Sequence, residues 1–77
     1  MTPNLLDVVA LLEDSPKNGL VRGQVGTIVE VVEPGVFEID FSDNNGRSYA
    51  IAPFREDQLL LLYHHQVVPA YKIPTHT

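Results

Sequence analysis

The chain has 77 residues, with ten acidic and five basic side chains, a formal net charge of −5 and no cysteine. This length allows one small domain with a free energy of unfolding of about 5 kcal/mol, and it argues against an enzyme with a deep cleft between two lobes. The absence of cysteine excludes disulfide bonds and thiolate zinc sites. The basic residues are scattered singly, so the chain lacks the cluster of positive charge that nucleic-acid binding requires.

No apolar run approaches the roughly 20 residues of a membrane-spanning helix. Met1 is followed by neither the basic segment nor the small-residue cleavage site of a secretory signal. We therefore expect a cytoplasmic protein that does not associate with membranes.

The first predicted element is a strand over residues 7–12. The apolar residues of the Leu5–Leu12 run also fit one face of a helix, so a helix remains an alternative there. Residues 13–19 contain Pro16 and the pair Asn18-Gly19, which are typical of a loop. Leu20 and Val21 are expected to fold back beneath this loop as apolar plugs.

A glycine-punctuated stretch, residues 19–26, predicts a sharply bent entry into a central strand over residues 27–32. This strand is β-branched except at Glu30. Side chains alternate along a strand with a period of two, so one set of four residues is expected to face the core: Val25, Thr27, Val29 and Val31. The other face would carry Ile28, Glu30 and Val32. Residues 33–35 form a predicted turn with Pro34 and Gly35 at its centre.

The next strand, residues 36–41, alternates clearly, with Phe37, Ile39 and Phe41 toward the core and Glu38 and Asp40 outward. A turn over residues 42–46 leads to a fourth strand over residues 47–52. Pro53 is expected to end that strand, and the residues that follow it, 54–58, are expected to form a single turn of 3₁₀ helix. A continuously apolar last strand over residues 59–63 is then predicted to be buried on both faces.

These elements together predict an all-β fold, a small closed SH3-like barrel of five strands over residues 1–63, with a 3₁₀ turn before the last strand. Residues 64–77 contain two spaced prolines and are expected to form an extended C-terminal tail.

Three stretches carry a likeness to a known family: residues 5–14 (LLDVVALLED), 19–30 (GLVRGQVGTIVE) and 37–43 (FEIDFSD). Over residues 5–62 the chain resembles the small bacterial family catalogued as domain of unknown function 4926. The resemblance implies an SH3-like barrel with no assigned activity and therefore no catalytic residues. The run Arg-Gly-x-Val-Gly-Thr at residues 22–27 is also similar to the barrel in the β subunit of nitrile hydratases. The family resemblance further implies a bacterial gene pair that encodes a toxin-like protein and a small neutralising partner.

No motif in the chain predicts chemistry. His64 and His65 are adjacent on a strand and point to opposite faces, so they do not form a metal site, with or without the distant His76. The carboxylates lie in turns or on outward strand positions, where paired acid and base catalysis is not expected. The glycine-rich stretch lacks the lysine and the following helix of a phosphate-binding loop. We expect neither an enzyme nor a bound metal or cofactor.

Protein binding is the function that this pattern favours. SH3-like barrels bind partners in an aromatic groove beside the long first loop or at an open sheet edge. Seven residues are predicted to form such a site, namely the aromatic Tyr49, Phe54 and Tyr63 with an acidic rim of Glu13, Asp14, Glu56 and Asp57. An acidic rim predicts a partner with a basic surface. A second surface, comprising Ile28, Val32 and tail residues 67–73, predicts a homodimer.

Two classes of function follow from these observations. The first is a non-catalytic protein–protein interaction module, in its antitoxin-like form the neutralising partner of a protein encoded by a neighbouring gene. The second is an accessory or regulatory subunit of an enzyme, as the likeness to nitrile hydratase implies.

Overall fold

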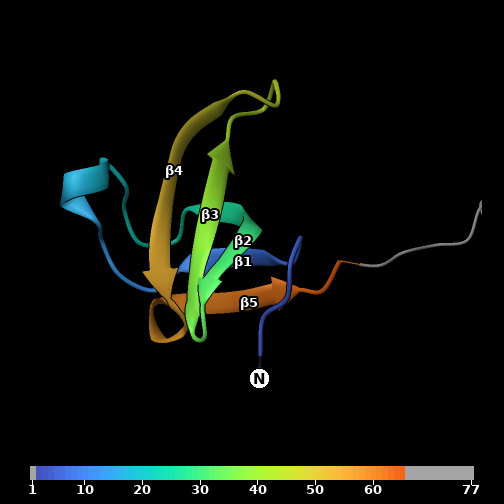
Figure 1. Ribbon diagram of the computed structural model, residues 1–77. Coiled ribbons are helices and arrows are strands. Elements are labelled where there is room, and N and C mark those ends of the chain that lie inside the picture. Colours follow the sequence, from blue (N-terminus) through green and yellow to red (C-terminus); the bar gives the residue numbers. More distant parts are fainter. Residues whose placement is uncertain (1, 66–77) are drawn as a thin grey trace, which may run out of the picture.

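The computed structural model describes residues 2–65 and is all-β (Figure 1). Five strands and two short 3₁₀ helices follow one another in the order β1 (Val8–Leu11), η1 (Pro16–Asn18), β2 (Val25–Glu33), β3 (Val36–Ser42), β4 (Ser48–Arg55), η2 (Glu56–Gln58) and β5 (Leu59–Tyr63). The Leu5–Leu12 run therefore contains a strand, as predicted, and not a helix. The predicted 3₁₀ turn before the last strand is confirmed, although it is shorter than expected.

All strand pairs are antiparallel, and the order across the sheet is β4-β3-β2-β1-β5. The last strand thus returns to lie beside the first, while β4 and β5 form the two edges of the sheet. The prediction of a closed barrel is wrong, because the described strands include no ladder that joins β4 to β5. The chain passes between these two edge strands through η2, which turns it without extending the sheet.

Pro53 lies inside β4, opposite Glu38 of β3, and does not end the strand as predicted. Proline lacks the N–H group that a central strand would need to donate to a neighbour. Because β4 is an edge strand, its outer side has no neighbour and the proline is tolerated there.

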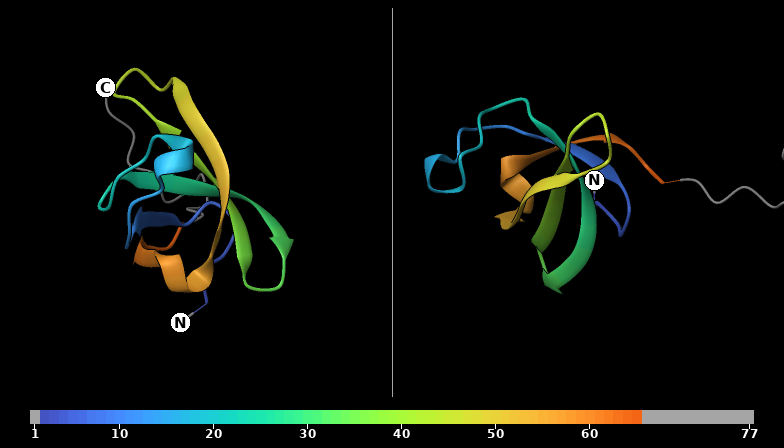
Figure 2. Two further views of the ribbon diagram at one scale, coloured as in Figure 1. Left: turned by 90° about the vertical axis from the view of Figure 1, so that its left-hand side faces the viewer. Right: turned by 90° about the horizontal axis from the view of Figure 1, so that it is seen from above.

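The long strand β2 joins two halves of the sheet that cross over each other (Figure 2). Its first residues pair with β1 and its later residues pair with β3. Two register shifts, between Ile28 and Glu30 and between Val31 and Glu33, interrupt the pairing with β3. Such bulges bend a strand and increase its twist, which lets one strand belong to both halves.

The apolar core lies between these crossing halves. It comprises Val9, Leu11, Leu20, Ile28, Phe37, Ile39, Phe41, Ala52, Phe54 and Leu59. The predicted inward set of β3 is confirmed. Of the two predicted plugs, Leu20 is buried and Val21 is exposed. The last strand is buried only at Leu59, so the prediction of burial on both faces is wrong.

The predicted facing of β2 is also wrong. Ile28, expected on the outer face, is completely buried, whereas Val25, Val29 and Val31 are exposed. The phase of this strand is set by Gly26, which faces the core together with Ile28. A Cβ atom at Gly26 would lie 2.5 Å from Cγ2 of Ile39 and 2.9 Å from the carbonyl oxygen of Asp40. Only glycine allows β2 and β3 to approach so closely, so the core face passes through a residue with no side chain.

Candidate functional site

The three aromatic residues of the predicted groove come from two strands, β4 and β5. Phe54 is buried in the core near η2. Tyr49 lies at the start of β4, where its hydroxyl accepts a hydrogen bond of 3.1 Å from Nε2 of Gln24 and its ring lies 6.4 Å from that of Phe41. Tyr63 lies at the end of β5 and is exposed. Phe41 thus packs against both Tyr49 and Phe54, whose ring centroid is 6.0 Å from its own, whereas Tyr63 lies on a different strand.

A hollow of about 230 Å³ does lie beside the long first loop, where the groove was expected. Residues from η1, from the start of β3, from the end of β4 and from η2 line it: Ser15, Lys17, Asn18, Val36, Pro53, Phe54, Arg55 and Gln58. Its only aromatic residue is Phe54. The hollow therefore has a small apolar floor beneath a mostly polar rim.

The predicted acidic rim is close to this hollow, but basic groups accompany it. Arg55 Nε donates to Asp57 Oδ1 at 3.0 Å, and the backbone N–H of Arg22 donates to Asp14 Oδ1 at 2.8 Å. Glu13 accepts a hydrogen bond of 2.8 Å from Nε2 of Gln58. These three carboxylates thus have local partners, whereas Glu56, the fourth residue of the predicted rim, lies at the start of η2, where its backbone N–H donates to the carbonyl oxygen of Gly35 at 2.9 Å. Lys17 and Arg55 line the hollow as well, so the rim carries both signs of charge.

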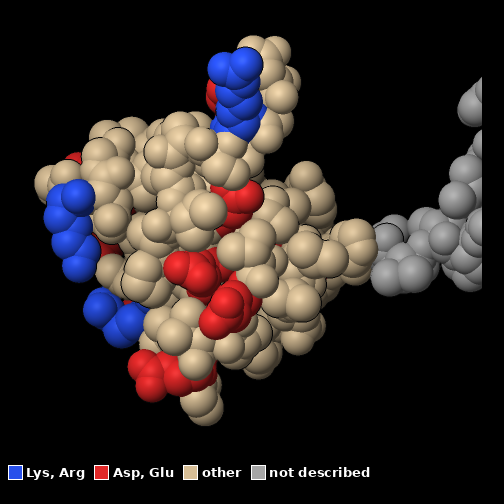
Figure 3. Space-filling view, turned by 45° about the horizontal axis from the view of Figure 1, so that its top comes forward, with Lys and Arg blue, Asp and Glu red and all other residues tan. Residues whose placement is uncertain are grey.

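A different set of carboxylates has no basic partner among the described residues. Glu30 of β2 lies directly opposite Glu38 of β3, and Asp40 follows two residues along on the same face of β3. We call these three residues the acidic row. Figure 3 shows acidic side chains gathered in the middle of one face of the molecule. Like charges placed directly opposite each other on a sheet destabilise it, so this arrangement is not explained by folding.

The alternating pattern predicted that Glu38 and Asp40 point outward, but it did not bring them together with Glu30. The alternating pattern predicts the face of each strand. It does not predict the register between two strands, and the register brings the charges together.

Asp7 is the one charged side chain buried among the described residues, with 2% of its surface exposed. Its carboxylate accepts hydrogen bonds from the backbone N–H of Asn4 at 2.8 Å and from that of His65 at 2.8 Å. The third contact, of 2.9 Å, is with Nδ1 of His64. Because an ionised carboxylate can only accept, this ring nitrogen carries the proton. Asp7 therefore holds the start of the chain against the segment that follows β5.

Two opposing effects set the pKa of Asp7. Burial raises it, but the backbone N–H groups of His65 and Asn4 and the ring of His64 stabilise the charged form, and they hold the pKa of Asp7 below its ordinary value of 3.8. A charged residue inside the apolar Leu5–Leu12 run was the only signal in the sequence for this role. Its partners His64 and His65 are too far along the chain to be paired with it from sequence.

Residues 2–65 were predicted to contain neither a metal site nor a membrane-spanning helix. Among residues 2–65 no group of three His, Cys, Asp or Glu side chains lies close enough to hold a metal ion. His64 contacts Asp7 through its ring, whereas His65 does so through its backbone. His76 and the predicted tail surface at residues 67–73 lie outside the described part. Within that part, no helix has the length and apolar character needed to cross a membrane.

Comparison with known proteins gives one family. Residues 5–61 match the family described as Domain of unknown function (DUF4926). The chain belongs to this family. Neither the curated proteins nor the solved structures provide a match. The matched range of DUF4926 includes the acidic row and Asp7, and it ends within β5.

Proposed function

We propose that this DUF4926 protein is a non-catalytic interaction module that binds another protein through a basic surface of that partner. The observation that supports this proposal is the acidic row. Glu30 and Glu38 face each other across two strands with Asp40 beside them, and no described lysine or arginine neutralises them. An opposed pair of like charges costs about 0.2–1 kcal/mol, which positive charges on a partner would relieve.

The charge of the whole chain supports the same partner. A net charge of −5 on 77 residues attracts a basic surface over distances longer than direct contact and increases the rate of association. The family resemblance suggests the product of a neighbouring gene as this partner, with the present chain as the neutralising, antitoxin-like half of the pair.

We also propose that the fold is SH3-like. This assignment is supported by the antiparallel order of the strands, by the return of β5 to the side of β1 and by the 3₁₀ turn that precedes β5. In SH3-like modules a segment of the partner binds beside the long first loop, the position of the hollow that contains Lys17 and Phe54. This hollow would then add a second, smaller contact to the acidic row.

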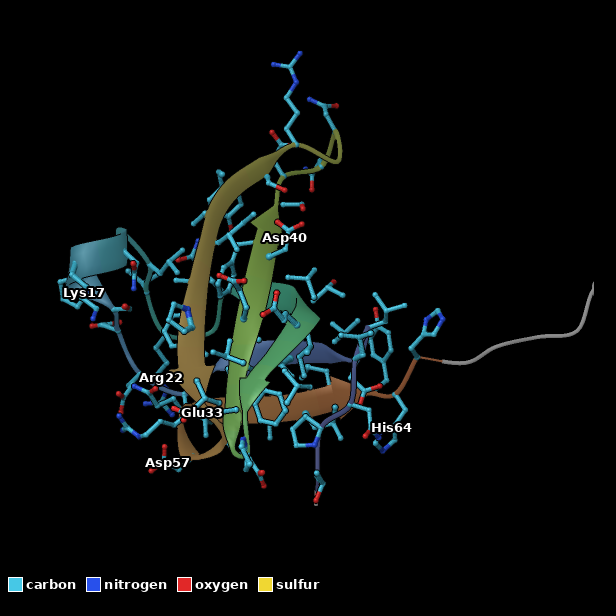
Figure 4. All side chains as sticks on the ribbon, in the orientation of Figure 1. Lys17, Arg22, Glu33, Asp40, Asp57 and His64 are labelled. Carbon is cyan, nitrogen blue, oxygen red and sulfur yellow. The ribbon has the colours of Figure 1, made fainter. Side chains whose placement is uncertain are left out.

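Co-expression with the neighbouring gene product, followed by co-purification and a titration of binding at low and high salt, tests the proposal. The double variant Glu38→Gln with Asp40→Asn should weaken binding by about tenfold at low salt, mainly through a slower association rate. Asp57→Asn is the matched control, because Asp57 lies in η2, at the lower left of Figure 4 and away from Asp40 on β3, and is paired with Arg55. Failure to form any complex, or equal binding by the double variant and the control, would overturn the proposal.

A further inference from the structure

The outer surface of β1 and of the two strands paired with it, β2 and β5, is largely apolar, with Thr27 opposite Val8 as a polar member. Along residues 8–12, Val9 and Leu11 are buried in the core. Val8, Ala10 and Leu12 therefore lie on the opposite side of the sheet. Ala10 pairs with Val25 on one side and with Leu60 on the other. We call the resulting surface the outer apolar face and define it as Val8, Ala10, Leu12, Val25, Leu60 and Tyr63.

Most of this face is exposed to solvent and none of its residues is charged, although Ala10 at its centre is buried, with 8% of its surface exposed. Val25 and Leu60 each have 47% of their surface exposed, and Tyr63 has 63%. Single exposed apolar residues are ordinary on protein surfaces. A continuous set across three paired strands is not, and it marks a surface that another group covers.

The chain leaves the described structure at the border of this face. Tyr63 pairs with Val8, and His65, two residues later, is held by the carboxylate of Asp7. Figure 4 shows His64 beside the end of β5, on the opposite side of the molecule from Lys17. Residues on both sides of the border also enclose a hollow of about 380 Å³: Leu6, Val8, Tyr63, His64 and His65. The next residues of the chain therefore begin next to the apolar surface.

The composition and length of that remaining segment match the face. Five of the seven residues at positions 67–73 are apolar or aromatic, namely Val67, Val68, Ala70, Tyr71 and Ile73, and Lys72 is the only charged one. Pro69 and Pro74 favour an extended chain and argue against a regular helix in this segment. Residues 66–73 can extend about 26 Å, whereas three adjacent strands are only about 10 Å wide from the first axis to the last.

We propose that residues 67–73 of the same chain pack on the outer apolar face. The tether at His65 is the reason to prefer this occupant over a second copy of the protein. A short linker gives a tethered segment an effective concentration in the millimolar range, far above that of a free second molecule in a dilute solution. The packed segment would shield Leu60 and Val25 from water. This inference concerns contacts within one chain and does not depend on the proposed partner.

Paramagnetic relaxation measured by NMR on the full chain tests the packing directly. The sequence contains no cysteine, so Thr75→Cys provides a unique site for a nitroxide label just beyond the apolar segment. The amide signals of Ala10, Val25 and Leu60 should fall to about half or less of their intensity in the reduced sample, because the tethered segment is mostly bound.

Two variants of the labelled chain and one matched control separate specific packing from chance contact. Leu60→Lys places a charge on the face, and Tyr71→Ser removes the largest side chain of the segment without changing a described residue. Both should restore the amide signals. Ile51→Lys should not, because Ile51 is equally accessible, with 56% of its surface exposed, but lies on β4 at the far edge of the sheet.

A mixed sample distinguishes the two occupants. One half of the mixture is enriched in ¹⁵N and carries no nitroxide. The other half carries the nitroxide and has no ¹⁵N enrichment, so any loss of signal reports a contact between two molecules. Unchanged signals in this mixture support packing within one chain. Signal loss in the mixture as large as in the single sample would overturn the inference in favour of a second copy. No loss on the outer apolar face in either sample would overturn it entirely.

Discussion

Replacing the buried carboxylate of Asp7 by the neutral amide of Asn is expected to destabilise the fold severely. The amide has the same shape, but it presents an NH₂ group where the carboxylate has an acceptor oxygen. Two N–H donors, from Asn4 and His65, and the Nδ1–H of His64 converge on Asp7. At least one of them would then face another donor and lose its hydrogen bond.

The contacts of Asp7 set the expected magnitude. Hydrogen bonds to a charged group contribute about 1.5–3 kcal/mol each, so three of them would give an upper limit that exceeds the whole stability of about 5 kcal/mol. Asn4 and His65 are exposed residues, however, and their N–H groups can return to water in the variant. We therefore expect Asp7→Asn to lower the free energy of unfolding by about 2–3 kcal/mol.

Urea denaturation followed by far-UV circular dichroism measures this loss. The midpoint should move to lower urea with an unchanged slope, because the surface exposed on unfolding stays the same. Asp57→Asn is the control. Asp57 makes an exposed pair with Arg55, and loss of such a pair costs at most about 1 kcal/mol. A variant at Asp7 that is as stable as this control would refute the reasoning.

The pH dependence gives the same prediction a second test. The pKa of Asp7 in the folded chain lies below its ordinary value, so protonation favours the unfolded chain. The contribution of Asp7 is therefore complete above about pH 4 and is lost as the pH falls through the folded-state pKa. The difference in stability between the natural chain and Asp7→Asn should shrink as the pH falls below about 4, and a constant difference would contradict this assignment.

Three further predictions concern β2, the acidic row and the first loop. Gly26→Ala should cost about 1–3 kcal/mol in urea denaturation, because its methyl group would meet the core where β2 and β3 touch. Glu38→Gln should raise the melting temperature by relieving repulsion with Glu30, about 0.2–1 kcal/mol at low salt, and the gain should fade in high salt. Leu20→Ala should cost about 2–5 kcal/mol, whereas the adjacent Val21→Ala should have no measurable effect on the same denaturation curves, because only Leu20 is buried.

Sequence patterns were sufficient to predict a strand and its buried face where the local signal and the tertiary packing agree. The alternation of Phe37, Ile39 and Phe41 predicted both β3 and its buried face, and the turns around Pro34-Gly35 and Asn45-Gly46 predicted where the chain reverses. The facing of β2 could not be predicted in the same way. Its β-branched residues suit either face, and the close contact of Gly26 with β3 decides between them.

The candidate site depended on the tertiary structure to a greater extent. Local composition identified the acidic character of the chain and the outward direction of Glu38 and Asp40. The register of β2 against β3, which places Glu30 opposite Glu38, is a property of paired strands. The role of Asp7 likewise depends on groups 57 and 58 residues away in sequence.

The sequence by itself determined that this is a small, acidic, all-β chain with five strands, because alternation and turn chemistry act between neighbouring residues. The tertiary structure alone decided that the sheet stays open between β4 and β5, which side chains of β2 are buried and which carboxylate is enclosed. Those outcomes depend on contacts between distant segments, where packing space and hydrogen-bond partners exist only after the strands have come together.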